Sequence, residues 1–280
     1  MKLSIIIIAK NEEKMIRDCL KSVSWADEVV LVDTGSTDRT LEISKKTLSN
    51  VKIIKTKKGS FFEWRNLGFK KSSGDWVLYV DADERVTKAL REEILSAVKT
   101  PPSVAPQDAG TPRTVERISS YRIPRGNYYF GKRVKHGGSW PDYVTRLFKR
   151  KDFAGWKGII HESPKFKGEP GTLKNPLIHF AHRNIGSCLE KGLKWTRLEA
   201  KLFYKAKHPP ITWWRLLKVA GQEFFKRVVL LQGFRDGLVG IIEAGVQVIN
   251  RLMVYIQLWE IQQKPSLKEK QKMIEKEIIK

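Results

Sequence analysis

The chain has 280 residues, of which 41% are hydrophobic and 30% are charged, a composition that excludes a disordered or fibrous protein. The formal net charge of +23 predicts attraction to polyanions, whether nucleic acid, an anionic membrane face or a phosphorylated substrate. The two cysteines, Cys19 and Cys188, lie far apart in no CxxC pattern, so we expect neither a disulfide framework nor a zinc ribbon.

The first apolar run, from Leu3 to Ala9, is too short for the core of a signal peptide, so we expect a strand there. No uncharged apolar stretch reaches the roughly 18 residues needed to cross a bilayer. The sequence therefore predicts no integral transmembrane segment.

Short β-rich runs alternate with amphipathic stretches up to residue 99. The expected strands are 3–9, 28–33, 51–55 and 76–81, and the expected helices are 13–23, 38–47, 62–71 and 87–99. This alternation indicates an α/β fold, Rossmann-like, with a mostly parallel sheet and helices on both faces. Ligands of such sheets bind at the carboxyl ends of strands, which here carry the polar segments 9–12, 33–36 and 81–84.

The segment that follows the second strand has the residue types of a nucleoside-binding turn. Asp33 can accept hydrogen bonds from a uracil or ribose edge, Gly35 permits a tight turn, and Ser36 or Thr37 can cap the next helix. A capped turn that binds no ligand is the structural alternative.

Asp81, Ala82 and Asp83 follow the fourth strand. Carboxylates one residue apart leave a strand end on the same side, so both can approach one Mg²⁺ or Mn²⁺ ion that bridges a diphosphate. Such an ion would neutralise charge on a departing nucleoside diphosphate. A solvated acidic turn is the alternative.

The middle of the chain contains a loop and then a basic region. Residues 100–117 are rich in Pro, Ala, Gly and Thr and predict a surface loop or insertion without catalytic residues. From Tyr121 to Ile160, ten Lys or Arg stand against two acidic residues, with aromatic residues between them. We interpret this region as an acceptor-facing surface, with a solvated basic face as the alternative.

The C-terminal third has two apolar stripes at helical spacing. They comprise Trp213, Leu217, Ala220, Phe224, Val228 and Leu231, and then Leu238, Ile241, Gly245, Val248, Leu252, Tyr255 and Trp259. Arg215, Lys218 and Lys226 lie off the first stripe, as in a basic amphipathic helix at a membrane interface. A helical hairpin packed on the sheet domain is the alternative. We expect a sheet domain over 1–182, a helical region over 183–262 and a basic tail over 263–280.

Together, these segments resemble glycosyltransferase family 2, which has the GT-A fold, and within it bacterial enzymes of lipopolysaccharide core assembly of the β-1,4-glucosyltransferase type. The resemblance extends from Met1 to about Glu260 and rests on residues 8–13, 25–28, 33–40, 74–78, 81–85, 136–138, 141–143, 146–148 and 161–162. It implies an inverting enzyme that moves glucose or another hexose from a UDP-linked donor to a lipopolysaccharide core or another cell-envelope glycan or glycolipid. A polyprenyl-phosphate or protein-directed glycosyltransferase of the same fold is the alternative.

The resemblance also assigns roles to individual residues. Those expected at the nucleotide sugar are Ala9, Asn11, Glu12, Asp33, Gly35, Ser36, Arg65, Asn66, Asp81 and Ala82. Asp83 would be the firmest ligand of Mg²⁺ or Mn²⁺, Asp81 would contact ribose or a metal-bound water, and His179 or His182 could join the metal or the diphosphate. The enzyme would be cytoplasmic and peripheral on the anionic inner face of the cell membrane.

Inverting transfer also needs a carboxylate that removes the proton of the acceptor hydroxyl. Glu162 in His161-Glu162 matches the order of the family's arginine, glycine and acidic motifs, whose last acidic residue is the base. Asp142 is the rival candidate, and two ordinary surface acids are the structural alternative.

Three other classes of protein fit less well. A nucleic-acid-binding protein would explain the charge but leave the acidic strand ends unexplained, so no nucleic acid partner is expected. A sugar-nucleotide pyrophosphorylase would carry a glycine-rich loop at residues 9–12, which contain no glycine. A glycosidase needs paired carboxylates but no nucleotide-like turn.

Overall fold

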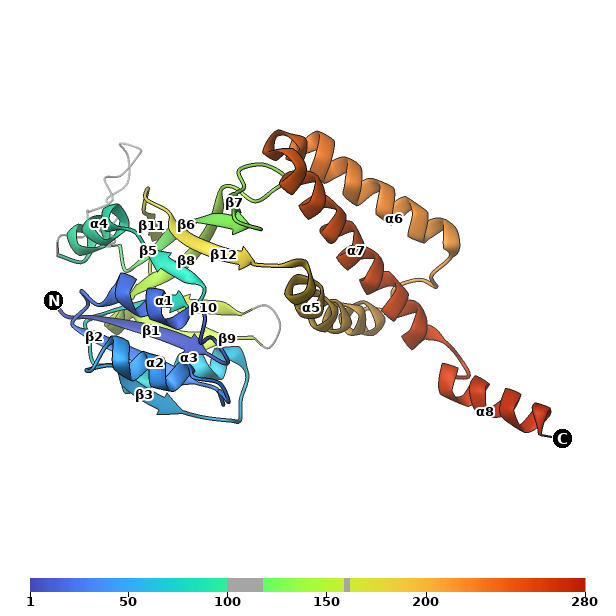
Figure 1. Cartoon of the computed structure of the whole chain (residues 1–280), viewed down its shortest axis with the longest axis horizontal. Coiled ribbons are helices and arrows are strands. Elements are labelled where there is room, and N and C mark those ends of the chain that lie inside the picture. The colour runs from blue at the N-terminus through green and yellow to red at the C-terminus, as the bar shows by residue number, and fades with distance from the viewer. Residues whose placement is uncertain (100–117, 159–161, 280) are drawn as a thin grey trace, which may run out of the picture. The chain divides into compact units, whose positions relative to one another are not determined.

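The computed structural model describes residues 1–99, 118–158 and 162–279, in two compact units (Figure 1). Unit 1 comprises Met1–Asn127 and Pro141–Phe180, and unit 2 comprises Tyr128–Trp140 and Ala181–Lys280. The predicted loop at 100–117 and His161 lie outside the described residues. The expected sheet domain over 1–182 thus ends near the end of unit 1, whereas its segment 128–140 groups with the helices of unit 2.

The sheet of unit 1 begins with four parallel strands in the order β3 (Lys52–Lys55), β2 (Glu28–Asp33), β1 (Leu3–Ala9) and β4 (Trp76–Asp81). Ala9 pairs with Asp33, and Ile8 pairs with Asp81. The carboxyl ends of these three neighbouring strands therefore lie at the same edge of the sheet.

The rest of the sheet is mainly antiparallel. It continues through β8 (Asp142–Lys149), β6 (Ser120–Tyr129), β12 (Leu177–His182) and β5 (Glu84–Val86), while β7 (Lys132–Arg133) and β11 (Pro170–Thr172) also pair with β6. After the 3-10 helix η1 (Arg150–Asp152), β9 (Phe153–Lys157) and β10 (Ser163–Phe166) form a separate pair. The predicted α/β class is confirmed, but the sheet is mixed, and the mostly parallel description holds only for its N-terminal half.

Alternating side chains of the parallel strands contribute to two hydrophobic cores, one on each face of the sheet. Leu3, Ile5 and Ile7 face α1 (Ile16–Val23), α2 (Thr40–Thr47) and α4 (Lys88–Lys99). Ile6 faces α3 (Phe61–Lys71) and the strand β9 on the opposite side. Strands with both faces covered explain why β1 is a continuous apolar run rather than an alternating one.

The C-terminal third is helical, as predicted. It contains α5 (Ile185–Lys205), α6 (Trp213–Phe225), the π-helical turn η2 (Lys226–Leu230), the 3-10 turn η3 (Gly233–Asp236), α7 (Gly237–Gln262) and α8 (Leu267–Ile278). The segment expected only as a basic tail thus forms the helix α8, which Ser266 and Glu269 cap reciprocally.

One helix of the described residues, Gly233–Gln262, is long and apolar enough to cross a membrane by length and composition. The sequence-based expectation of no such segment counted only uncharged stretches, whereas this helix includes Glu243 and Arg251. Only 28% of its most apolar window is buried within the protein.

Candidate functional site

The loops that follow β1 and β2 are bound to each other at the carboxyl edge of the sheet. The Thr34 N–H donates to the Ala9 carbonyl at 3.0 Å, and the Asn11 N–H donates to Ser36 Oγ at 3.0 Å. The Asn11 side-chain oxygen accepts from the Thr37 N–H at 2.8 Å. The predicted segments 9–12 and 33–36 therefore form one continuous polar surface.

Asp33 is buried inside this surface, with 2% of the residue exposed. Its carboxylate accepts the backbone N–H of Ser36 at 3.2 Å and of Gly35 at 3.3 Å, so Asp33 closes its own turn. Gly35 has φ +98°, a value that glycine adopts without steric cost. Contact between Asp33 and a nucleoside remains a prediction.

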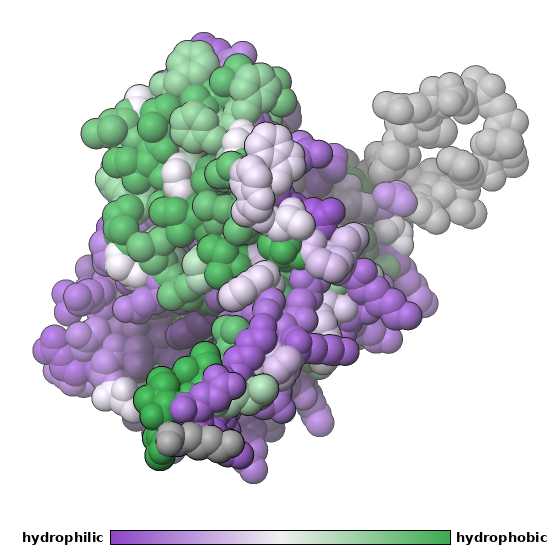
Figure 2. Space-filling model, turned by 90° about the vertical axis from the view of Figure 1, so that its right-hand side faces the viewer, coloured by the Kyte–Doolittle hydropathy of each residue, from purple (hydrophilic) through white to green (hydrophobic). Residues whose placement is uncertain are grey.

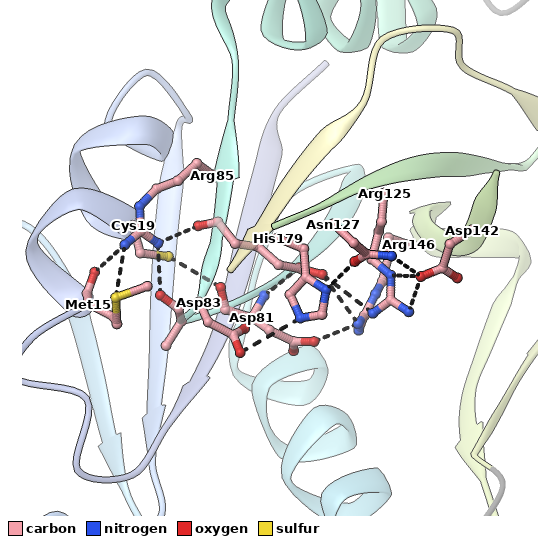
Figure 3. Close-up of polar contacts among 12 residues, drawn as sticks. Met15, Cys19, Asp81, Asp83, Arg85, Arg125, Asn127, Asp142, Arg146 and His179 are labelled. Carbon is pink, nitrogen blue, oxygen red and sulfur yellow. Dashed lines mark hydrogen bonds and ion pairs between the residues drawn. The ribbon is translucent and has the colours of Figure 1, made fainter. Parts of the chain in front are cut away.

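Asp81 and Asp83, at the β4–β5 turn, have different partners (Figure 3). Asp81 Oδ2 lies 2.6 Å from Nη2 of Arg146 on β8, and its Oδ1 lies 3.6 Å from Nη2 of Arg65 on α3. Burial disfavours the ionised form of Asp81, but the charges of Arg146 and then Arg65 outweigh it and hold the pKa of this carboxyl well below its usual range. Asp81 is therefore a fixed anion.

Glu84 lies beneath Asp81 and is fully buried. Its Oε2 accepts the Asp81 N–H at 2.8 Å, and its Oε1 lies 3.9 Å from Arg146 Nη2. Burial, and then the negative charge of Asp81, raise the pKa of Glu84 to about 7. Arg146 thus serves two carboxyl groups, and its Nε and Nη1 are buried without an acceptor among the described residues.

Asp83 faces His179, which β12 places opposite Glu84 (Figure 3). His179 Nδ1 lies 2.7 Å from the Asn127 side-chain oxygen, and His179 Nε2 lies 3.7 Å from Asp83 Oδ2. Because the amide oxygen can only accept, Nδ1 carries a hydrogen in this arrangement, and Nε2 is the ring nitrogen that faces Asp83.

The four residues expected around a metal do not form one cluster. His182 lies within unit 2, where its Nδ1 is 2.8 Å from Oε2 of Glu243 and its ring stacks on Tyr129. Across the described ranges, no group of three or more His, Cys, Asp or Glu side chains could hold a metal ion. Asp83 and His179 are the ligand types that the structure does bring together.

Arg65 also connects Asp81 with the predicted base, Glu162. Arg65 Nε lies 3.4 Å from Glu162 Oε2, and its guanidinium stacks 4.3 Å from the ring centre of Trp156. Burial raises the pKa of Glu162 despite the opposing charge of Arg65. A carboxylate with a raised pKa that shares Arg65 with Asp81 has the property that a general base needs.

The rival Asp142 is engaged by two side chains of β6. Its Oδ2 lies 2.7 Å from Arg125 Nη2 and accepts from the Asn127 amide at 3.1 Å. Arg125 and Asp142 are register partners in the sheet, so this pairing follows directly from the strand alignment. Asp142 is thus held by two side chains of β6 at hydrogen-bond distance, whereas Arg65 approaches Glu162 only to 3.4 Å.

Two further predicted residues have structural partners. The Asn66 side-chain amide pairs with both backbone groups of Trp156, at 3.0 and 2.8 Å, and so ties β9 to α3. The Ala82 side chain is buried in the core, and its carbonyl accepts from Arg85 Nη1 at 2.9 Å. Their contacts with a nucleotide sugar remain predictions.

Sequence reasoning assigned no role to Arg146, Glu84, Arg125 or Asn127. The available signal was Arg146 itself, a cation directly before the apolar residues Leu147 and Phe148. A charged residue in a buried strand requires a partner, and here the partners are Asp81 and Glu84.

Comparison with known proteins identifies relatives that match most of the chain. A glycosyltransferase of Rickettsia typhi, itself uncharacterised, is 40% identical over 257 residues, which are 85% of this chain and 81% of that protein. The lipopolysaccharide core biosynthesis glycosyltransferase LpsC of Rhizobium meliloti is 27% identical over 255 residues, which are 87% of each chain.

Among solved structures, glucosyl-3-phosphoglycerate synthase of Mycobacterium tuberculosis, in complex with Mn²⁺, UDP and phosphoglyceric acid, overlaps with a TM-score of 0.45 at 19% identity. The overlap covers 74% of this chain and 79% of that one and is too loose to support an argument about the site. The sequence carries the assignment: the profile of Glycosyl transferase family 2 matches residues 4–157. The predicted family and its GT-A fold are therefore confirmed, and the chain belongs to glycosyltransferase family 2.

Proposed function

We propose that this glycosyltransferase inverts the anomeric centre as it transfers a hexose from a nucleotide sugar, most simply a UDP-hexose, to a cell-envelope glycan or glycolipid. The observation that carries the proposal is the position of Arg65 between Asp81, at the end of a parallel strand, and Glu162. Nucleotides bind at such strand ends, and a carboxylate beside them can serve the acceptor.

The donor would lie on the surface made by segments 9–12 and 33–36. Its backbone groups and the turn at Gly35 suit a nucleoside, and Arg146 has N–H groups without an acceptor among the described residues for an oxygen-rich ligand. In this proposal Asp81 is a fixed anion for ribose hydroxyls, because its two arginines keep it ionised.

A divalent cation fits the pair Asp83 and His179. Mg²⁺ and Mn²⁺ sites of sugar-nucleotide enzymes need few protein ligands, because diphosphate oxygens and waters complete the shell. The Nδ1 bond of His179 to Asn127 fixes the ring so that Nε2 faces Asp83, as the outer partner of a metal-binding histidine does. When bound, the ion would act as a Lewis acid for the charge on the departing nucleoside diphosphate.

Glu162 would act as the general base. The acceptor oxygen attacks the anomeric carbon from the face opposite the nucleotide, and its proton passes to the Glu162 carboxylate. The bond between the anomeric carbon and the diphosphate oxygen breaks, and its electron pair leaves with the nucleoside diphosphate. Burial of Glu162 supports this role because it raises the proton affinity of the carboxylate.

The acceptor class and the cellular location are supported by the relatives and the charge. LpsC is named for lipopolysaccharide core biosynthesis, which makes a core oligosaccharide or another envelope glycolipid the first acceptor to try. The net charge of +23 favours a peripheral position on the anionic, cytoplasmic face of the cell membrane. A polyprenyl-phosphate or protein acceptor is the alternative within the same fold.

A donor screen tests the proposal directly. Purified protein is incubated with UDP-, GDP- and dTDP-hexoses with and without Mn²⁺, and the released nucleoside diphosphate is measured. We expect metal-dependent release from a UDP-hexose by the wild-type protein, and loss of metal-dependent UDP binding in calorimetry for Asp83→Asn. Asp18→Asn, an exposed aspartate on α1, is the matched control and should bind UDP normally. If no nucleotide sugar is hydrolysed, the proposed donor class is wrong. If folded Asp83→Asn binds UDP in Mn²⁺ as tightly as the wild type, the assignment of Asp83 as a metal ligand is wrong.

A further inference from the structure

The helices of unit 2 expose apolar side chains to an unusual extent. The side chains of Trp213 on α6 and Leu238 on α7 are among the most exposed, at 72% and 74% of their residues' surface. The exposed set comprises Trp213, Trp214, Leu217, Phe224, Phe225, Val229, Leu230, Leu238, Ile242, Ile249 and Ile256. Figure 2 shows hydrophobic residues gathered in a broad patch over α6 and α7. We call this set the apolar face.

The members of the apolar face recur at helical spacing. On α7, Leu238, Ile242 and Ile249 stand four and seven residues apart, and Ile256 follows seven residues later, so all four lie in one stripe. On α6, Trp213, Leu217 and Phe224 repeat the first part of this spacing. Each helix therefore turns a continuous apolar stripe outward.

Polar groups lie where α6 meets α5 and α7, whereas α5 and α7 pack on each other through an apolar core of Ala200, Val254 and Leu258. Arg227 Nε lies 2.6 Å from Glu223, Arg251 Nη1 lies 3.0 Å from Glu199, and Glu243 is buried. A cleft of about 130 Å³ between α5, α6 and α7 is lined almost wholly by polar side chains. Its lining residues are Thr196, Glu199, Glu223, Arg227, Gln247, Asn250, Arg251 and Val254.

The outward apolar stripes of α6 and α7, beside a polar cleft, depart from the pattern of a helical bundle in water. A water-soluble bundle buries its apolar stripes and exposes its charges, and a large exposed apolar patch marks a surface that something covers. Helices in a lipid environment direct their polar residues toward one another and their apolar residues outward. The arrangement in unit 2 therefore matches a hydrocarbon environment on the outer side of α6 and α7.

Exposed cations border the apolar face. Lys218 and Lys226 lie beside it on α6 and η2, and no ion pair is formed by either among the described residues. Lysines beside an apolar stripe are attracted to anionic lipid headgroups while their stems cover apolar surface. Charge complementarity thus favours an anionic bilayer over a second copy of this strongly basic chain, which would be repelled.

The contacts of α7 with α5 limit how deeply the apolar face can enter a bilayer. Arg251 on α7 pairs with Glu199 on α5, and Gln262 at the end of α7 donates to the His208 carbonyl just after α5 at 2.9 Å. The 21 residues of α5 include five basic and two acidic ones. A spanning α7 would carry this charged helix into the hydrocarbon, which is costly, so α7 cannot span while the unit stays folded.

We infer that the apolar face of α6, η2 and α7 is a membrane-docking surface that lies in the plane of an anionic bilayer, with its side chains in the headgroup and upper acyl region. The inference deepens the proposed location on the membrane, on which it rests, and specifies the elements and the depth. Trp213 and Trp214 are the side chains suited to the interface, because their rings are apolar and their N–H groups are polar.

Flotation with vesicles tests the surface. The double variant Leu217→Glu/Leu238→Glu is compared with Leu193→Glu, a change of an exposed leucine on α5 outside the apolar face. Wild type and Leu193→Glu should float with vesicles of phosphatidylcholine and phosphatidylglycerol, and less with phosphatidylcholine alone or at high salt. The double variant should partition at least about 10-fold more weakly, because it loses two inserting side chains and adds two anions.

Depth is measured on the unsubstituted protein, which avoids any effect of the substitutions on folding. Lipids brominated near the headgroup should quench tryptophan fluorescence more strongly than lipids brominated at the chain ends. Equal flotation of the wild type and the folded double variant would overturn the docking surface. Resistance to alkaline carbonate extraction would indicate that α7 spans the membrane instead of docking on it. A dimer that forms without lipid and is dissociated by the double substitution would indicate that the apolar face serves self-association instead. Donor hydrolysis in solution is measured on the same preparations, so loss of catalysis and loss of docking are read separately.

Discussion

Arg65 lies between the carboxylates of Asp81 and Glu162, which have different proposed roles. Asp81 also has Arg146, at 2.6 Å, and stays ionised, whereas the ion pair that Glu162 forms among the described residues is with Arg65, at 3.4 Å, and burial raises its pKa. Although both carboxylates lie beside Arg65, Asp81 stays an anion, whereas Glu162 can take up a proton.

Glu162→Gln tests this separation. The amide keeps the size of the side chain but cannot accept a proton, so kcat should fall about 10²-fold or more while UDP affinity is unchanged. In the wild type, kcat/KM should fall as the pH drops through the pKa of Glu162, because the base must be ionised. Since burial raises that pKa, the fall should occur at a higher pH than an exposed glutamate would give.

Asp142→Asn is the control for this experiment, measured as transfer rate and UDP binding across the same pH range. It removes one acceptor of Arg125 but no group next to Arg65. A dead Asp142→Asn enzyme with normal UDP binding, beside an active Glu162→Gln enzyme, would move the base to Asp142.

The sequence could reveal some of these residues but not others. Asp83 follows an apolar strand and Glu162 ends a familiar order of motifs, so both were visible without coordinates. The pairing of Arg125 and Asn127 with Asp142 was not, because the register of β6 against β8 shifts between Tyr121 and Arg122, where β8 has an extra residue. Such a shift changes which residues lie opposite each other across the two strands, and it cannot be read from either strand alone.

At the scale of elements, the contact between α3 and β9 determines where the aromatic support of Arg65 lies. Asn66 on α3 binds both backbone groups of Trp156, whose ring lies under the Arg65 guanidinium. The preceding residue, Gly155, has φ +98°, and a Cβ there would come within 2.7 Å of the Asn66 side-chain oxygen.

Gly155→Ala should therefore destabilise unit 1 by about 2–3 kcal/mol, from backbone strain and from displacement of Asn66. Gly131→Ala is the matched control, because Gly131 also has positive φ, +80°, but a Cβ there meets nothing within 4 Å. We expect a loss of about 1 kcal/mol for the control, from strain alone. Urea unfolding measures both, and equal losses would show that the Asn66 contact contributes nothing.

Helical spacing predicted the apolar stripes of α6 and α7 but not the direction in which they face. A stripe of period 3.6 only states that one side of a helix avoids water, and the same pattern fits a packed hairpin or a membrane. The direction depends on which side the neighbouring helices take, and on α7 that side carries the buried Glu243 and the Val254 and Leu258 that pack on α5. The partner of Glu243 is His182, 61 positions away, so local sequence does not indicate this side.

For the molecule as a whole, the order of strands predicted the fold but did not give the division of the chain. Residues 128–140 extend from the sheet strand β6 yet group with the helices. The reason is Asp236, whose carboxylate accepts the N–H groups of Lys135 and His136 at 2.9 and 2.7 Å. Such a contact across about a hundred positions has no signature in local sequence.

The two buried cysteines give this division a practical consequence. Cys19 belongs to unit 1 and Cys188 to unit 2, and burial raises the pKa of both thiols, so each is protected from alkylation while its unit is folded. Alkylation under native conditions should then follow transient opening of each unit, one thiol reporting on each. Mass spectrometry of a labelling time course in UDP and Mn²⁺ should show Cys19 slowed and Cys188 unchanged, because Cys19 Sγ contacts the carbonyl of Asp81, which we propose binds the donor. The alkylation rate of Cys19 would thus report on the opening of unit 1, and that of Cys188 on the opening of unit 2.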